Sequence, residues 1–222
     1  MDKAFHQIIP EIVLKHMPGS FQSFLICDTY SVEQLQIDAD LPDQVDKDNI
    51  ENDPLCKHAH SHKMKMQDGK LILVDGSALE RIVGLCEDAH DFNKEGKHDL
   101  VRYCLGKMSH YCIDGQCTFP HQHVGKPWSL HHAKFEAELG KYVTKHRDAI
   151  QDAIQDIEFT AYKDVLIGCT KHAMAAWYLG EEIVQKYEDR VHLTDDEMLD
   201  IVKVCVQGVG DLWTTLAKEL KL

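Results

Sequence analysis

Histidines and carboxylates gather between His110 and Glu136 at spacings that suit metal binding. His110 and Asp114 are four residues apart, as are His132 and Glu136, so each pair shares one face if its segment is helical. Imidazole and carboxylate together are ligands of zinc and of other borderline divalent metals. His121, in the Gly- and Pro-containing segment between the pairs, adds a fifth donor. Five donors exceed what one tetrahedral ion needs, which predicts a multinuclear site.

The alternative is an ordinary polar helix surface. A histidine and a carboxylate four residues apart form a common exposed pair, and one such pair indicates nothing more. Two pairs with a histidine between them favour the metal site. Thiolates of Cys104, Cys112 or Cys117 are possible extra ligands, although the nearby imidazoles and carboxylates already meet the need. Because the eight cysteines form no C-x-x-C pair, a zinc finger is not expected and reduced thiols are favoured.

Further candidate ligands lie upstream of this cluster. Residues 38–53 contain seven acids and one lysine, which is typical of a solvated loop. Within it Asp43 directly follows a proline, which places the acid on a bend. Next come three alternating histidines, His58, His60 and His62, of which one is expected to be a ligand.

Length and composition bound the class of protein. The chain of 222 residues suits a single domain over 1–222, and a hydrophobic fraction of 44% is enough for a sizeable core. The net charge of -13 argues against a stable nucleic-acid partner, which would require a basic surface. The absence of a long apolar run excludes a transmembrane helix. Without a recognisable signal peptide the sequence as it stands predicts a cytoplasmic protein, or an extracellular one whose leader has been removed.

Apolar periodicity predicts an all-α, multi-helix protein. Ser77, with Glu80 three residues on, is expected to cap one helix, and Thr194 is expected to cap the last. Residues 71–77 form a short strand or lead into a helix. Gly208 and Gly210 are expected to loosen the last helix, and both Trp177 and Trp213 to belong to the core. The expected helices cover 4–16, 20–37, 77–94, 99–114, 130–156, 161–189 and 195–220.

The motifs YCLGKMSHYCID, FPH and HHAKFE, in that order, resemble the pattern of the zinc-dependent phospholipase C family. That family shows a Tyr-Leu-Gly helix, a His-Tyr-x-x-Asp ligand pair, a Pro-His loop and a closing His-x-x-[FY]-Glu. The related single-strand-specific nucleases share its all-helical bundle, with three zinc ions in one cleft. The resemblance covers roughly residues 1–140, and its central motif is the specific part. It implies an all-α bundle with a metal cleft.

The resemblance also implies a ligand set. A first zinc would be held by His110, Asp114, Asp43 and an upstream histidine, with His62 preferred and His60 in reserve. In the family's chemistry, Asp43 would also orient or deprotonate the attacking water, and Glu136 would help to set the geometry. A second zinc would take three residues from the loop and the closing motif: His121, His132 and Glu136.

A third zinc marks a departure from the family pattern. By resemblance, Asp114 would bridge to it and His6 would bind it. The family completes this site with the amino group and carbonyl of an N-terminal Trp, whereas this chain begins with Met1 and its first tryptophan is Trp128. Either the Met1 backbone supplies the same atoms, or the third site is weak or empty.

The resulting prediction is a metal-dependent phosphodiester hydrolase, most simply phospholipase C-like, with up to three zinc ions per chain or other divalent metals such as iron. Clustered metals about 3.5–4 Å apart clamp the attacking and leaving oxygens of a phosphodiester and lower the pKa of water to roughly 7. The expected partner is a phospholipid or another phosphodiester, with transient contact with a membrane surface. Two alternatives remain: a single-strand nuclease or nucleotidase on the same scaffold, and a non-enzymatic metal-binding helical protein.

Overall fold

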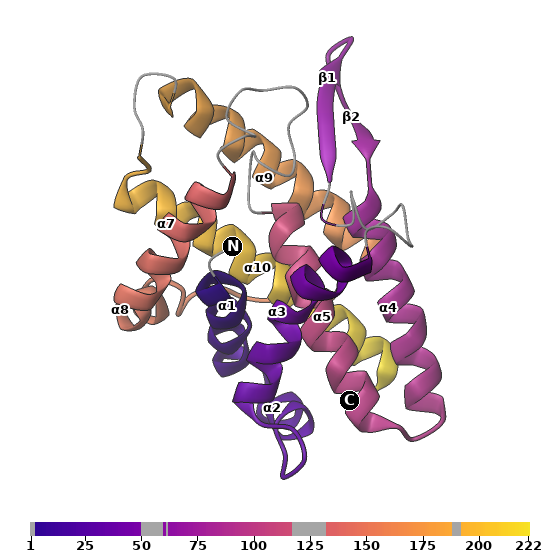
Figure 1. Ribbon diagram of the computed structural model, residues 1–222. Helices are drawn as coiled ribbons and strands as arrows, with labels where there is room; N and C mark the ends of the chain where they lie inside the picture. The colour runs from indigo at the N-terminus through magenta and orange to yellow at the C-terminus, as the bar shows by residue number, and fades with distance from the viewer. Residues whose placement is uncertain (1–2, 50–59, 61, 117–131, 188–191) are drawn as a thin grey trace.

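The computed structural model describes residues 3–49, 60, 62–116, 132–187 and 192–222 (Figure 1). This part of the chain is mostly helical, with one small antiparallel hairpin, which confirms the all-α class. Its elements, in chain order, are α1 (Lys3–His16), α2 (Gly19–Leu25), α3 (Val32–Asn49), β1 (Lys63–Gln67), β2 (Lys70–Asp75), α4 (Ser77–Lys94), α5 (His98–Gln116), α7 (His132–Lys145), α8 (Arg147–Ala153), α9 (Val165–Tyr187) and α10 (Asp195–Leu220).

Helix α5 occupies the centre of the bundle and packs against α3, α4, α9 and α10 (Figure 1). Helix α1 packs against α3, α7 and α10. Trp213 of α10 is fully buried in the main core and donates its Nε1–H to the carbonyl oxygen of Leu105 at 3.3 Å. Trp177 is buried in a second, smaller cluster, so the prediction that both tryptophans are core residues is confirmed.

The region between residues 20 and 53 differs from the prediction. The expected helix 20–37 is divided by a turn in which Cys27 and Tyr30 exchange backbone hydrogen bonds of 3.0 and 3.1 Å. The expected acidic loop 38–53 is wrong for residues 38–49, because α3 continues through Pro42. Proline removes only one helical N–H donor, and the burial of Leu35 and Ala39 against the bundle favours continuing the helix. Asp43 therefore lies on a helix and not on a bend.

Three further helix boundaries can be compared with the predictions. Thr194 caps α10 with Glu197 in a complete capping box, as predicted. For α4 the capping prediction is wrong: Gly76 is the N-cap, and the side chain of Asp75 accepts from the backbone N–H of Ser77 at 3.1 Å. The expected helix 130–156 is interrupted at His146, where α7 ends and α8 begins.

The last helix was expected to loosen at its two glycines. Helix α10 is continuous through Gly208 and Gly210, so the predicted loosening is not observed. A Cβ at position 210 would collide with the ring of Phe159, so glycine here allows a close packing contact.

The segment expected to be a short strand or the approach to a helix contains the strand β2. It pairs with β1 across a two-residue turn in which Asp68 and Gly69 both have positive φ.

Six cysteines in the described regions are free thiols, in agreement with the expectation of reduced cysteines: Cys27, Cys86, Cys104, Cys112, Cys169 and Cys205. Among the described helices, none combines the length and the apolar character that crossing a bilayer requires.

Candidate metal centre

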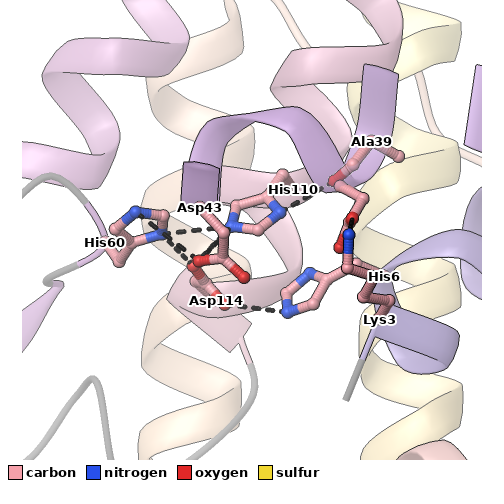
Figure 2. A network of polar contacts seen from close by, with 8 residues as sticks. Lys3, His6, Ala39, Asp43, His60, His110 and Asp114 are labelled. Carbon is pink, nitrogen blue, oxygen red and sulfur yellow. Dashed lines mark hydrogen bonds and ion pairs between the residues drawn. The ribbon is translucent and has the colours of Figure 1, made fainter. Parts of the chain in front are cut away.

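Residues from four parts of the chain meet at the C-terminal half of α5 (Figure 2). His110 and Asp114 lie one turn apart on α5, His6 comes from α1, Asp43 from α3, and His60 from just before β1. Their donor atoms form two groups of three, each within 4.8 Å. The first group is His6, His110 and Asp114, and the second is Asp43, His60 and His110. The two groups share His110.

The orientation of His110 is fixed by the backbone of α3. Its Nδ1 lies 2.7 Å from the carbonyl oxygen of Ala39, and because a carbonyl only accepts, Nδ1 carries the proton and donates. Its Nε2 then faces three polar atoms: it lies 3.2 Å from Asp114 Oδ2, 3.5 Å from Asp43 Oδ1 and 3.1 Å from His60 Nδ1. A neutral ring would direct a lone pair at two carboxylates, which is unfavourable unless a cation or a second ring proton lies between them.

Asp114 presents its two oxygens to different histidines. Oδ2 lies 2.5 Å from His60 Nδ1, and Oδ1 lies 3.4 Å from His6 Nε2 (Figure 2). The carboxylate is fully buried, and so are the rings of His6 and His110, which stack with centroids 4.1 Å apart. A carboxylate in this position can bridge two ions, one bound through each oxygen.

The cluster reaches solvent on one side. The side chains of His60 and Asp43 are 19% and 16% exposed, whereas those of His6 and His110 are fully buried. A small ligand or water would therefore approach past His60 and Asp43. Both ring nitrogens of His6 are buried without a hydrogen-bond partner among the described residues. Buried polar atoms usually find a partner, so this ring is a candidate metal ligand.

Burial and the neighbouring charges set the protonation of the cluster. Burial lowers the pKa of His6, and the adjacent His110 lowers it further. Burial alone would lower the pKa of His110 too, but Asp114 and Asp43 raise it well above its usual value. For Asp43, burial acts to raise the pKa, and hydrogen bonding and charge from His110 outweigh this and lower it. Without a metal, the two carboxylates would favour a second proton on His110, and a metal bound at Nε2 would replace that positive charge.

The structure places the predicted ligands as follows. It brings together His6, Asp43, His110 and Asp114, and it adds His60, the reserve candidate, in the place that the sequence analysis gave to His62. The side chain of His62 belongs to neither donor group and is buried beside Gly115 in a small pocket that includes Ile82 and Cys169. Of the two candidate histidines, His60 is therefore the one whose ring lies beside His110 and Asp114.

The second predicted trio is only partly described. Glu136 is fully buried on α7, which packs against α1, and its charge raises the pKa of His6. It therefore lies near enough to His6 to act on that ring through its charge. His132 begins α7, but the position of its side chain lies outside the description. The other two predicted contributors, His121 and Met1, also lie outside the described residues.

Sequence reasoning missed one contributor, Ala39, and gave His60 only as the reserve to His62. Ala39 acts through its backbone oxygen, which no motif reveals, because the contact depends on how α3 packs against α5. The sequence pattern also did not distinguish His60 from His62 as the residue that reaches the cluster. Both lie in an alternating run, and only the position of β1, which begins at Lys63, decides which imidazole reaches α5.

Comparisons of the chain with protein-family models, with curated proteins and with solved structures find no match.

Proposed function

We propose that this chain is a metal-dependent phosphodiester hydrolase of the phospholipase C type, with zinc or another divalent metal bound at the cluster around His110. One observation carries the proposal. His110, held by the carbonyl of Ala39, directs its Nε2 at Asp114, Asp43 and His60 together. Metal-binding histidines commonly donate their other N–H to a backbone carbonyl, which fixes the ring and leaves one nitrogen for the metal.

The donor chemistry supports a divalent metal. Three imidazoles and two carboxylates are the hard and borderline ligands that zinc and iron accept, and none of the five is a thiolate. Asp114 would bridge two ions, with Asp43, His60 and His110 on its Oδ2 side. His6 would lie on the Oδ1 side, where the charge of Glu136 also acts. Bound ions would lower the pKa of a water molecule and offset the charge of a phosphate in this acidic protein.

The chain's own residues would divide the remaining work. Asp43 is the partly exposed carboxylate, so it can orient a water molecule entering from solvent and accept its proton. Asp114 and Glu136 are fully buried, which suits them to binding metal and not to exchanging protons with solvent. His110 is fixed on both sides and would hold its position during the reaction.

The test is hydrolysis of a chromogenic phosphocholine diester and of phosphatidylcholine, with single-stranded DNA as the substrate that distinguishes a nuclease. Activity should disappear with a chelator and return when zinc is added. Asp43→Asn should lower kcat by about 100-fold or more, the usual range for loss of a proton acceptor. The matched control is Asp40→Asn on the same helix, where the carboxylate instead pairs with Lys3 at 3.0 Å.

Three outcomes of these assays would change the proposal. Activity that is indifferent to chelation would rule out the proposed metal chemistry. Cleavage of DNA with no hydrolysis of the phosphocholine substrates would replace phospholipase by nuclease. Tight metal binding with no hydrolysis of any of these substrates would favour a non-enzymatic metal protein.

A further inference from the structure

An imidazole and two thiols that the candidate metal centre does not use line one small cavity. His62 comes from just before β1, Cys112 from α5 and Cys169 from α9. The cavity has a volume of about 10 Å³, which is room for about one water molecule or one ion. All three residues are buried, with 4%, 1% and 7% of their surface exposed. We call this cavity, with these three residues, the thiol cavity.

The ring of His62 is a buried polar group with no hydrogen bond. Within the described part of the chain, neither of its nitrogens has a hydrogen-bond partner. The ring lies against the end of α5, where a Cβ at Gly115 would be 3.7 Å from its Nδ1. Because buried polar atoms are usually paired, an imidazole in this position is a candidate ligand.

The two thiols lie next to each other. Cys112 is hydrogen-bonded to Cys169, and both are free thiols. Cys112 is two residues from His110 and from Asp114 along α5, yet neither cysteine belongs to the donor groups of the candidate metal centre. The soft sulfur donors are therefore separate from the imidazoles and carboxylates that suit zinc or iron.

We propose that the thiol cavity is a second metal site, which binds one monovalent copper ion through the two sulfurs and the ring of His62. Thiolates are the soft ligands that select monovalent copper, zinc and iron–sulfur clusters. Zinc in structural sites almost always takes four ligands, whereas the cavity supplies three, a number that suits monovalent copper. A cavity with room for one ion is too small for an iron–sulfur cluster. This site does not depend on the proposed function.

The charge of monovalent copper also suits the cavity. One thiol loses its proton as the copper–sulfur bond forms, and the proton passes to solvent. The single positive charge of the ion then cancels the negative charge of the thiolate, so the buried cavity gains no net charge. A divalent ion would leave a buried positive charge unless the second thiol also lost its proton.

Binding requires the three side chains to close around the ion. Their donor atoms do not all lie within 4.8 Å of one another, whereas the donors in each of the two groups around His110 do. Cys112 and Cys169 lie on helices, but His62 precedes β1 and belongs to no helix. The segment that carries His62 can therefore shift towards the thiols without breaking helical hydrogen bonds.

The experiment is competition for copper between the zinc-loaded protein and a chromogenic chelator of monovalent copper, without oxygen and with ascorbate as the reductant. The wild type should retain one copper ion per chain, and X-ray absorption at the copper edge should show sulfur and nitrogen neighbours. Cys169→Ser should weaken copper binding by about 100-fold or more, because loss of a direct ligand should exceed the cost of losing an outer contact. His62→Ala should weaken it by about tenfold or more.

The matched control is Cys86→Ser. Cys86 is as exposed as Cys169, at 7%, and its thiol lies 3.3 Å from the sulfur of Met108, so this variant tests another pair of sulfur atoms. It should bind copper like the wild type. Thermal unfolding without metal checks that each variant folds, and Cys112→Ser takes the place of Cys169→Ser if the latter does not.

Several results would overturn the proposal. One is loss of all copper from the wild type to the chelator, and another is retention of copper by Cys169→Ser. Loss of copper in Cys86→Ser would assign the ion to the other sulfur pair. Copper spread over several thiols, with no single variant affected, would show adventitious binding only.

The copper site and the proposed function fail separately. His60→Ala should weaken zinc binding and keep copper, whereas His62→Ala should do the reverse. Loss of copper in His60→Ala would place the ion at the candidate metal centre and overturn the second site. Copper binding without hydrolysis of any substrate would leave the copper site standing and remove the phospholipase.

Discussion

The Nδ1–H of His110 donates to the carbonyl oxygen of Ala39 at 2.7 Å, and this contact joins α5 to α3 at the candidate metal centre. Helix α3 continues through Pro42, one turn beyond Ala39. The same helix then carries Asp43 to within 3.5 Å of His110 Nε2. Helix α3 therefore contributes twice to the cluster. The carbonyl of Ala39 fixes the orientation of the His110 ring, and Asp43 places a carboxylate next to Nε2 of the same ring.

Metal binding should release protons, because His110 holds its second proton in the metal-free protein. Asp114 and Asp43 raise the pKa of His110 well above its usual value, and a metal at Nε2 must displace that proton. Apparent zinc affinity should therefore rise with pH and fall in acid. Titration calorimetry in two buffers with different ionisation enthalpies, near pH 7, should report about one proton released from this residue. A binding enthalpy that is independent of the buffer would contradict the assignment.

His60, and not His62, should control metal affinity. His60 lies 2.5 Å from Asp114, whereas His62 is buried outside both donor groups. His60→Ala should weaken metal binding by about 10–100-fold or more, while His62→Ala should change it little. Competition against a chromogenic chelator measures both. If His62→Ala lost the metal and His60→Ala kept it, the proposal that His60 is the ligand beside Asp114 would be wrong.

His62 should instead make the fold sensitive to acid. Burial lowers its pKa to about 4, from 6.5 in the unfolded chain. Above pH 6.5 both states are neutral and His62 makes no pH-dependent contribution. As the pH falls from 6.5 to 4, the unfolded chain binds the proton first, and the free energy of unfolding should drop by about 3 kcal/mol.

Denaturant unfolding with chelator present, at several pH values, measures this loss. His62→Gln removes the titrating group, so the variant should lose less stability than the wild type across the same window. Parallel curves for the two proteins would show that His62 is not responsible.

Two helix glycines should respond to alanine in opposite directions. At Gly210 the added methyl group would collide with Phe159, and at Gly84 nothing lies within 4 Å of it. Gly210→Ala should lower the free energy of unfolding by about 2 kcal/mol or more. Gly84→Ala, in the middle of α4, should raise it by about 0.5–1 kcal/mol through helix propensity. Urea unfolding compares the pair, and a stabilised Gly210→Ala would contradict the packing of the 154–164 segment on α10.

Local signals in the sequence predicted much of the fold. The capping box at Thr194 depends on residues only three positions apart, and its prediction is confirmed. Proline and acids suggested a loop at residues 38–53, but burial of Leu35 and Ala39 outweighed that local preference. Gly210 looked like a weak point because its partner, Phe159, is distant in the sequence.

The same division applies to the metal centre. His110 and Asp114 follow from a four-residue spacing, which is a local signal. That His6 and Asp43 join them was implied only by the family resemblance, because both come from other helices. The choice between His60 and His62, and the part played by Ala39, depend on how α3 and β1 pack on α5. No spacing along the chain encodes them.

The most direct test of the central claim is the metal content of the purified, untagged protein after reconstitution with zinc and removal of excess, measured by elemental analysis. The account predicts at least two zinc ions per chain for the wild type, and a loss of at least one in Asp114→Asn, since the carboxylate is the proposed bridge. Less than one zinc per chain in the wild type, or a full complement in Asp114→Asn, would contradict it.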